Sequence, residues 1–171
     1  NKVGIPLVEL SDVNGLDIVI DGADEFDPQF QLIKGGGAAL LREKIVAQES
    51  SSMVVVADKR KKVETLGAFP LPIEITPFAY NSTIRKISSI LDCRVNCRMS
   101  GDNPVITDNG NYIADAHCGP KITDPKTTES EILKVAGVVQ VGLFNDMCDV
   151  VILAEDGGIS TLVRQDGRID L

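Results

Sequence analysis

Three carboxylates lie within five residues, directly after an apolar run at residues 16–20. The segment reads Asp21, Gly22, Ala23, Asp24 and Glu25. Ionised carboxylates are strong hydrogen-bond acceptors, so this cluster could hold the hydroxyl groups of a sugar, or its oxygens could bind a divalent cation. A solvated turn is the third interpretation, because Asp and Gly dominate turns. The spacing does not match a calcium loop of the EF-hand type.

A second group combines a lysine with the three glycines Gly35, Gly36 and Gly37. Glycines let the backbone approach a ligand with its N–H groups, and the start of the next helix adds partial positive charge. Lys34 supplies a full positive charge, so the segment favours an anion. Neither the G-x-G-x-x-G fingerprint nor a Walker pattern is present, and a plain tight turn remains the alternative.

Glu43 lies within a helix predicted over residues 38–48. At about 100° per residue, Arg42, Glu43 and Lys44 point in three directions and cannot share one solvated face. Glu43 falls in a sector of small or apolar residues, namely Ala39, Leu40, Val46 and Ala47. Such neighbours disfavour the charged carboxylate and so raise its pKa. A raised pKa brings a carboxylate that acts as a general base closer to neutral pH. The alternative is a surface glutamate whose neighbours are merely small.

A basic run at residues 59–62 follows a third strand, predicted over residues 53–57. Charge runs are usually solvated, but one of these cations could bind a phosphate group. The carboxyl ends of strands in a parallel sheet are where ligands bind, and this position favours the phosphate interpretation.

The order of the first elements predicts the scaffold. Strands over residues 16–20, 31–33 and 53–57, with the helix over 38–48, predict a βαβ unit in a Rossmann-like parallel sheet. The loops after Ile20, Ile33 and Ala57 should then meet at one sheet edge.

The pattern changes after the connector at residues 69–72. We expect strands at residues 73–75, 94–99 and 138–144, hairpin arms at 105–107 and 112–116, and helices at 79–91 and 128–135. This order is typical of a ferredoxin-like α+β lobe. Strands at residues 149–154 and 159–163 should rejoin the first sheet. The predicted domains are therefore a core of residues 1–68 and 145–171, and an inserted lobe of residues 69–144.

Composition narrows the function classes. The chain has 171 residues, with 17 basic and 25 acidic side chains and a formal charge of −8. That charge argues against a nucleic-acid partner but permits a small anionic substrate. No apolar run approaches the roughly 20 residues that span a bilayer, so no membrane partner is expected. A C-x3-C pair, Cys93 and Cys97, and one His117–Cys118 dipeptide do not supply a zinc site, so we expect no metal and reduced thiols.

Several segments resemble ribose-5-phosphate isomerase of the A type. They are IDGADE at residues 20–25, LIKGGGAALLREKIVA at 32–47, ADKRKKVETLG at 57–67, FPLPIEI at 69–75, TDNGN at 107–111 and VGLF at 141–144. The resemblance covers essentially the whole chain. It implies an α/β enzyme of the non-oxidative pentose phosphate pathway that interconverts ribose 5-phosphate and ribulose 5-phosphate without a metal or an organic cofactor.

The resemblance also implies roles for individual residues. Glu43 would move a proton between C2 and C1, while Asp21 and Asp24 would bind the sugar and help to open its ring. Lys34 and the glycine amides would stabilise the enediolate oxygens, and Lys61 would bind near the phosphate. The implied substrate-binding residues are Asp21, Gly22, Ala23, Asp24, Lys34, Gly35, Gly36, Gly37 and Lys61.

The family also carries a phosphate-binding Ser/Thr-Gly loop near its amino terminus, and this chain begins at Asn1, after that segment. We therefore expect an N-terminally incomplete chain that is weakly active or inactive alone. The resemblance further implies a cytoplasmic homo-oligomer, a dimer or a tetramer.

Two other functions remain as hypotheses. A non-catalytic sugar-phosphate sensor on the same fold would keep the lysines and glycines but would not need Glu43. A dehydrogenase nucleotide-binding domain would need the glycine fingerprint that the sequence lacks.

Overall fold

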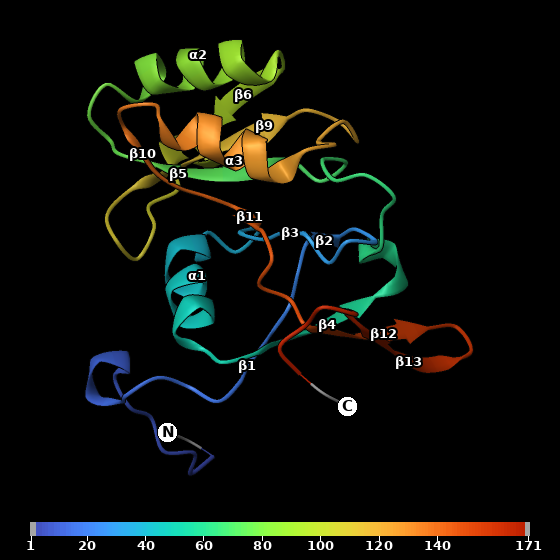
Figure 1. Ribbon diagram of the computed structural model, residues 1–171. Coiled ribbons are helices and arrows are strands. Elements are labelled where there is room, and N and C mark those ends of the chain that lie inside the picture. Colours follow the sequence, from blue (N-terminus) through green and yellow to red (C-terminus); the bar gives the residue numbers. More distant parts are fainter. Residues whose placement is uncertain (1–2, 170–171) are drawn as a thin grey trace.

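The computed structural model describes residues 3–169 and shows an α/β protein with a parallel sheet. Figure 1 places this sheet in the lower half, a lobe with two helices in the upper half, and a small sheet between them. No helix of the described part combines the length and the apolar character that a bilayer crossing requires.

The lower sheet has the order β1-β4-β12-β13. Its strands are β1 (Val19–Asp21), β4 (Met53–Asp58), β12 (Val150–Glu155) and β13 (Gly158–Val163). Strand β4 pairs in parallel with β1 and with β12, whereas β12 and β13 form an antiparallel hairpin. Met53, Val55 and Val151 are fully buried, which fits alternating β-branched strands with one covered face. The predicted strands at residues 53–57, 149–154 and 159–163 are confirmed.

The first predicted strand is shorter than expected. Its ladder with β4 begins at the pair Val19 and Met53, while Leu16 makes only an isolated bridge to Ser50. The helix α1 (Leu40–Glu49) links this region to β4, so β1, α1 and β4 form the parallel crossover.

The prediction that residues 31–33 form a strand of the parallel sheet is wrong. Strand β3 (Leu32–Ile33) lies in a three-stranded sheet of order β11-β3-β2, between β11 (Leu143–Phe144) and β2 (Glu25–Phe26). Both pairings are antiparallel. The Asp27 carboxylate accepts hydrogen bonds from the amides of Gln29 and Gln31, and this local turn closes the β2–β3 hairpin.

The upper lobe contains an antiparallel sheet of order β10-β5-β9-β6. Its elements run β5 (Leu71–Ile75), α2 (Tyr80–Leu91), β6 (Arg94–Cys97), β9 (Tyr112–His117), α3 (Pro125–Leu133) and β10 (Val138–Val141). Helices α2 and α3 contact each other and the sheet, whereas α1 of the lower part contacts β5 and β10. Tyr80 and Tyr112 meet edge to face in this lobe, with ring centroids 5.4 Å apart.

Two predicted strands of the lobe are interrupted. The strand expected over residues 94–99 ends at Cys97, and β7 (Met99–Ser100) pairs instead with β8 (Asn103–Pro104). The arm expected at residues 105–107 is reduced to a single bridge between Ile106 and Tyr112.

The strand expected over residues 138–144 breaks at Gly142 and passes from the lobe to the small sheet. The Gly142 amide donates to the Pro72 carbonyl, and the Gly142 carbonyl accepts from the Lys34 amide. A Cβ atom at Gly142 would lie 2.3 Å from the Lys34 carbonyl oxygen, so only glycine fits this crossing.

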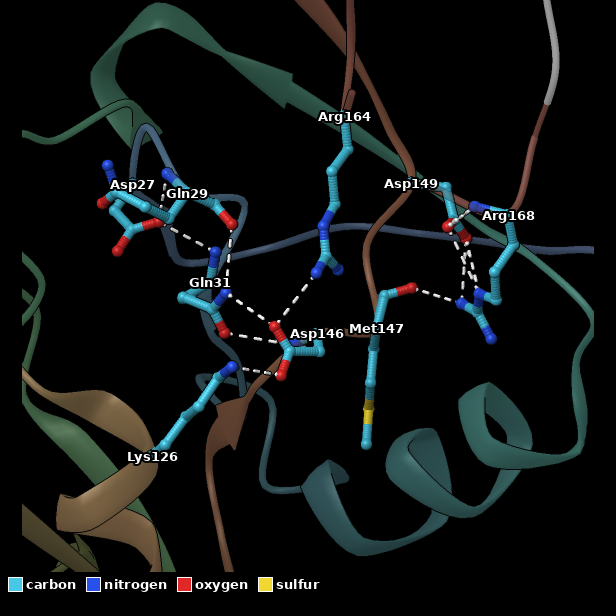
Figure 2. A network of polar contacts seen from close by, with 9 residues as sticks. All are labelled: Asp27, Gln29, Gln31, Lys126, Asp146, Met147, Asp149, Arg164 and Arg168. Atoms are coloured by element: carbon cyan, nitrogen blue, oxygen red, sulfur yellow. Dashed lines mark hydrogen bonds and ion pairs between the residues drawn. The ribbon is translucent and has the colours of Figure 1, made fainter. Parts of the chain in front are cut away.

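A buried carboxylate ties the carboxyl-terminal segment to the parallel sheet. Asp149 is 1% exposed and accepts hydrogen bonds from the Met53 amide at 2.8 Å and the Arg168 amide at 2.7 Å. Figure 2 shows the Arg168 guanidinium against the same carboxylate, with Nη2 2.9 Å from Oδ2. Burial acts to raise the pKa of Asp149, but the hydrogen bonds from Arg168 and Met53 outweigh burial and hold this pKa below the ordinary 3.8.

This carboxylate makes stability depend on pH. Because its folded pKa is depressed, its contribution is present above about pH 4 and is lost as the pH falls through the folded pKa. We expect the free energy of unfolding to fall on acidification, and Asp149→Asn to remove part of that slope. Urea unfolding between about pH 7 and pH 3 measures the slope, with the exposed Asp102→Asn as control. Equal slopes in Asp149→Asn and the parent would contradict this expectation.

Candidate active site

The loops after β1 and β3 meet, as expected, although the two strands belong to different sheets. Together with the first turn of α1 they enclose a cavity of about 200 Å³. Nine residues line it, and all were predicted as site residues: Asp21, Gly22, Ala23, Asp24, Lys34, Gly35, Gly36, Gly37 and Glu43.

Lys34 is the buried cation of this cavity. Its residue is 3% exposed, and its Nζ donates to the Gly22 carbonyl at 2.6 Å. The same Nζ lies 2.9 Å from Asp21 Oδ2 and 3.3 Å from Glu43 Oε2. One ammonium group therefore stands between a carboxylate at the end of β1 and a carboxylate of α1, and its position is fixed by contacts on three sides.

Glu43 lies in the first turn of α1, where the helix dipole stabilises negative charge. Its side chain is 27% exposed, and Oε2 is buried without a hydrogen-bond partner among the described residues, at ion-pair distance from Lys34. Leu40 and Ala47 of the expected apolar sector are buried. The carboxylate does not point to open solvent; it faces the cavity beside a cation. The apolar surroundings that the sequence predicted for the Glu43 carboxylate are thus only partly present.

The glycine loop is shaped by close contacts. Gly35 has φ +110°, and a Cβ atom there would lie 2.9 Å from Leu40 Cδ2. The Gly36 amide donates to Asp24 Oδ2 at 2.7 Å, so it is already occupied rather than free for a ligand. A Cβ atom at Gly37 would meet nothing within 4 Å, which leaves this position open.

Arg98 of the lobe braces this loop, and the sequence analysis missed it. Its Nη1 donates to the carbonyls of Gly35 and Gly36, both at 2.9 Å. Its Nε and Nη2 form a bidentate pair with Asp115 of β9, at 2.8 and 2.6 Å. No local pattern could reveal the contact, because 63 residues separate Arg98 from Gly35.

Replacing Arg98 with Ala should loosen the glycine loop. Hydrogen bonds to a charged group contribute about 1.5–3 kcal/mol each, and about 1.4 kcal/mol corresponds to a tenfold change in an opening equilibrium. We therefore expect hydrogen exchange at the Gly36 and Ala38 amides to accelerate at least about tenfold. Arg94→Ala is the matched control, because Arg94 is an exposed residue of β6 whose guanidinium contacts only Asn96 among the described side chains. An unchanged hydrogen-exchange rate at these amides in Arg98→Ala would show that Arg98 does not hold the glycine loop in place.

Lys44 anchors α1 to the lobe and was likewise missed. It is 2% exposed, and its Nζ donates to Glu129 Oε1 at 2.5 Å, to Gln140 Oε1 at 2.9 Å and to the Val141 carbonyl at 2.7 Å. Burial lowers the pKa of Lys44, and the Glu129 carboxylate opposes this shift. Helix α1, which carries Glu43, is therefore fixed to α3 and β10.

The TDNGN turn makes a second contact with α1. Glu74, which is fully buried, accepts hydrogen bonds from Thr107, Asn109 and Asn111 at 2.9–3.0 Å. Arg42 of α1 contacts the same segment, because its Nη2 donates to the Asp108 carbonyl at 2.7 Å. Glu74 thus holds the TDNGN segment in the conformation that contacts the start of helix α1.

Lys61 does not line the cavity of Lys34. It lies in the short helix η2 (Lys59–Lys61) and lines an adjoining cavity of about 450 Å³ with Arg60 and Phe69. Asp24 contributes to the walls of both cavities.

A larger cavity, of about 580 Å³, lies at the β2–β3 turn and contains no predicted site residue. Three of its charged groups bind one another: Asp146 pairs with Lys126 at 2.6 Å and with Arg164 at 3.1 Å (Figure 2).

The geometry defines a class: an α/β protein with carboxylates, a buried lysine and a glycine loop at the carboxyl end of a parallel strand. Comparisons with known proteins agree with this class. A family model described as ribose 5-phosphate isomerase A (phosphoriboisomerase A) matches residues 1–158. The chain belongs to this family.

Relatives of that name are similar over most of the chain. Ribose-5-phosphate isomerase A of Cereibacter sphaeroides is 47% identical over 175 residues, 98% of this chain and 66% of the relative. The Bacillus mycoides protein is 47% identical over 158 residues, 92% of this chain and 71% of the relative. The chain thus spans about two thirds of the length of the curated relatives it matches.

Solved structures agree in fold. A D-ribose-5-phosphate isomerase in complex with phospho-erythronic acid has a TM-score of 0.91 and 42% identity, over 95% of this chain and 72% of that one. The Plasmodium falciparum ribose 5-phosphate isomerase has a TM-score of 0.91 and 38% identity, over 96% and 72%.

Proposed function

We propose that the protein interconverts D-ribose 5-phosphate and D-ribulose 5-phosphate through an enediol(ate) intermediate. The observation that carries the proposal is the Lys34 ammonium between the Asp21 and Glu43 carboxylates on one small cavity. An aldose–ketose isomerisation needs one base near two adjacent carbons and positive charge where oxygen gains electrons.

Glu43 acts as the base in this mechanism. Its carboxylate removes the proton from C2 of the open-chain aldose, and the C2–H electron pair forms the C1–C2 double bond while the C1 carbonyl oxygen becomes negative. Lys34 stabilises that oxygen through its charge. After proton exchange between the two oxygens, the C2 carbonyl forms and Glu43 returns its proton to C1. Asp21 and Asp24 hold sugar hydroxyls and assist ring opening.

The phosphate end of the substrate is assigned to the adjoining cavity. Lys61 lines that cavity, and Asp24 joins it to the site of Lys34 and Glu43. A phosphate bound beside Lys61 would hold the reacting carbons in place at a distance, so that remote binding energy supports the chemistry.

The test measures proton transfer directly. This chain is incubated with ribose 5-phosphate in D2O, and NMR follows ribulose 5-phosphate and the deuterium at its C1. The sequence analysis expects the chain alone to be weakly active or inactive, and because the method accumulates signal over hours, it distinguishes these two cases. Unphosphorylated ribose is the control substrate and should react far more slowly. Absence of ribulose 5-phosphate above the level without protein would overturn the proposal that this chain carries out the isomerisation.

The sensor hypothesis gains no support from the relatives reported above, all of which are named isomerases. The dehydrogenase hypothesis is also weakened, because the glycine loop follows β3, which lies outside the parallel sheet.

The finer architectural and cellular assignments are also part of the proposal. The β-α-β-β-α-β order of the lobe supports a ferredoxin-like insertion at residues 69–144 in a Rossmann-like core of residues 1–68 and 145–171. Family resemblance supports a cytoplasmic dimer or tetramer that uses no metal or organic cofactor and binds neither nucleic acid nor membrane. A monomeric mass in light scattering would contradict the oligomer.

A further inference from the structure

Two cysteines that are distant in sequence face each other at one end of the lobe. Cys93 lies directly before β6, and Cys118 lies directly after β9. The antiparallel register pairs Arg94 with His117, so the next pair along the two chains is Cys93 with Cys118. Their Sγ atoms are 3.1 Å apart, and both residues are half-buried. The sequence analysis considered Cys118 only beside His117 and did not connect it with Cys93.

We propose that Cys93 and Cys118 are a site of reversible disulfide formation. A disulfide requires a sulfur–sulfur distance of about 2.05 Å and a Cα separation of about 4.4–6.8 Å, and directly opposite residues of an antiparallel pair fall within that range. Closing the bond therefore requires the sulfur atoms to approach by about 1 Å. The neighbours Asp92, at φ +47°, and Gly119, at φ +69°, place both cysteines beside turns rather than inside the ladder.

The other thiols of the described chain do not compete. Cys148 is fully buried, and burial raises the pKa of its thiol to about 12. Cys97 packs against the core of the lobe, and the one hydrogen-bond partner of its sulfur among the described residues is the Arg98 carbonyl, at 3.8 Å. Within residues 3–169 no three His, Cys, Asp or Glu side chains form a group that could hold a metal ion, so the pair lacks the further ligands of a zinc site.

The reaction is exchange with a small disulfide such as oxidised glutathione. The Cys93 thiolate attacks one sulfur of that disulfide, which forms a mixed disulfide and releases one glutathione thiolate. The Cys118 thiolate then attacks the Cys93 sulfur and releases the second glutathione. Two protein thiols lose two protons and two electrons, and one glutathione disulfide becomes two thiols.

The surroundings of the pair affect the pH at which the exchange proceeds. Burial, together with the hydrogen bond and charge of Cys93, raises the pKa of the Cys118 thiol to about 12. Because the thiolate is the attacking species, we expect the exchange to be faster at mildly alkaline pH than at neutral pH.

The bond would link residues 93 and 118 and enclose β6, β7, β8 and β9, the segment that contains Arg98 and the TDNGN turn. Cross-linking a loop of this size restricts the unfolded chain. We expect the thermal midpoint of the oxidised form to be about 5–10 °C higher than that of the reduced form.

The test uses the full chain under native conditions with oxidised glutathione at mildly alkaline pH. Intact mass should show the loss of two hydrogen atoms, and peptide mapping should find residues 93 and 118 linked. Cys118→Ser should stop at the mixed disulfide on Cys93, whereas Cys97→Ser should oxidise like the parent. Thiol counting should fall from four to two.

Three outcomes would overturn the proposal: four thiols that persist under these conditions, a link that involves Cys97 or Cys148, or oxidation seen only in urea. Because Cys118→Ser could affect folding, Cys93→Ala provides a second variant, in which no two thiols should be lost to a disulfide within the protein under these conditions. None of these readouts depends on isomerase activity.

Discussion

Replacing Glu43 with Gln is expected to lower isomerisation by about 10²–10⁴-fold, the range that a positioned general base contributes. Gln keeps the size of the side chain and can still accept a hydrogen bond, but it cannot remove the C2 proton. Because Lys34, Asp21 and the glycine loop remain, substrate binding should change little. The deuterium assay gives the rate, and titration with ribose 5-phosphate gives the affinity.

Glu49→Gln is the matched control, since Glu49 is an exposed residue at the end of the same helix. It should leave the rate unchanged. A Glu43→Gln variant with the rate of the parent would remove Glu43 from the mechanism. If neither the parent nor the variant turned over ribose 5-phosphate but both bound it, the sensor hypothesis would regain support.

Replacing Lys34 with Met should lower both activity and stability. Loss of the one charge that stabilises the enediolate oxygen is expected to reduce kcat by about 10²–10³-fold. Met is also unable to donate to the Gly22 carbonyl, and the carboxylates of Asp21 and Glu43 lose their shared cation. Because both carboxylates are partly exposed, we expect a modest loss of about 1–3 kcal/mol in the free energy of unfolding.

Urea unfolding followed by circular dichroism measures the stability, and the deuterium assay measures kcat. Lys59→Met is the control: this lysine is exposed and pairs with Asp156, away from the cavity. Lys34→Met with the kcat of the parent would show that positive charge at this position does not stabilise the intermediate.

The candidate site could be predicted in part from a general rule of parallel sheets, whose strands carry ligand sites at their carboxyl ends. Asp21 ends β1 of that sheet and Glu43 lies in the first turn of α1, so the rule accounts for both. Lys34 follows β3, which lies outside the parallel sheet, so the rule does not account for its place in the cavity. The strand at residues 31–33 shows the limit of this reasoning. Its two buried residues fit either sheet, and its place in the small sheet depends on Phe144, more than 100 residues away.

Other features depend on partners that no local pattern identifies. Arg98 acts through Gly35 and Asp115, and Lys44 is buried by Glu129 and Gln140 from other elements. Both bases look like ordinary surface charges in the sequence, since lysine and arginine are mostly exposed unless they are paired. Their contacts, which tie the lobe to the site, become visible only in three dimensions.

The edge-to-face contact of Tyr80 and Tyr112 has a spectroscopic consequence. The chain contains no tryptophan and only these two tyrosines, and both belong to the lobe. Near-ultraviolet absorbance and fluorescence from tyrosine therefore report the lobe alone, whereas far-ultraviolet ellipticity reports helices and strands in both halves. Unfolding curves that differ between the two signals would measure how independently the lobe and the parallel-sheet half lose their structure.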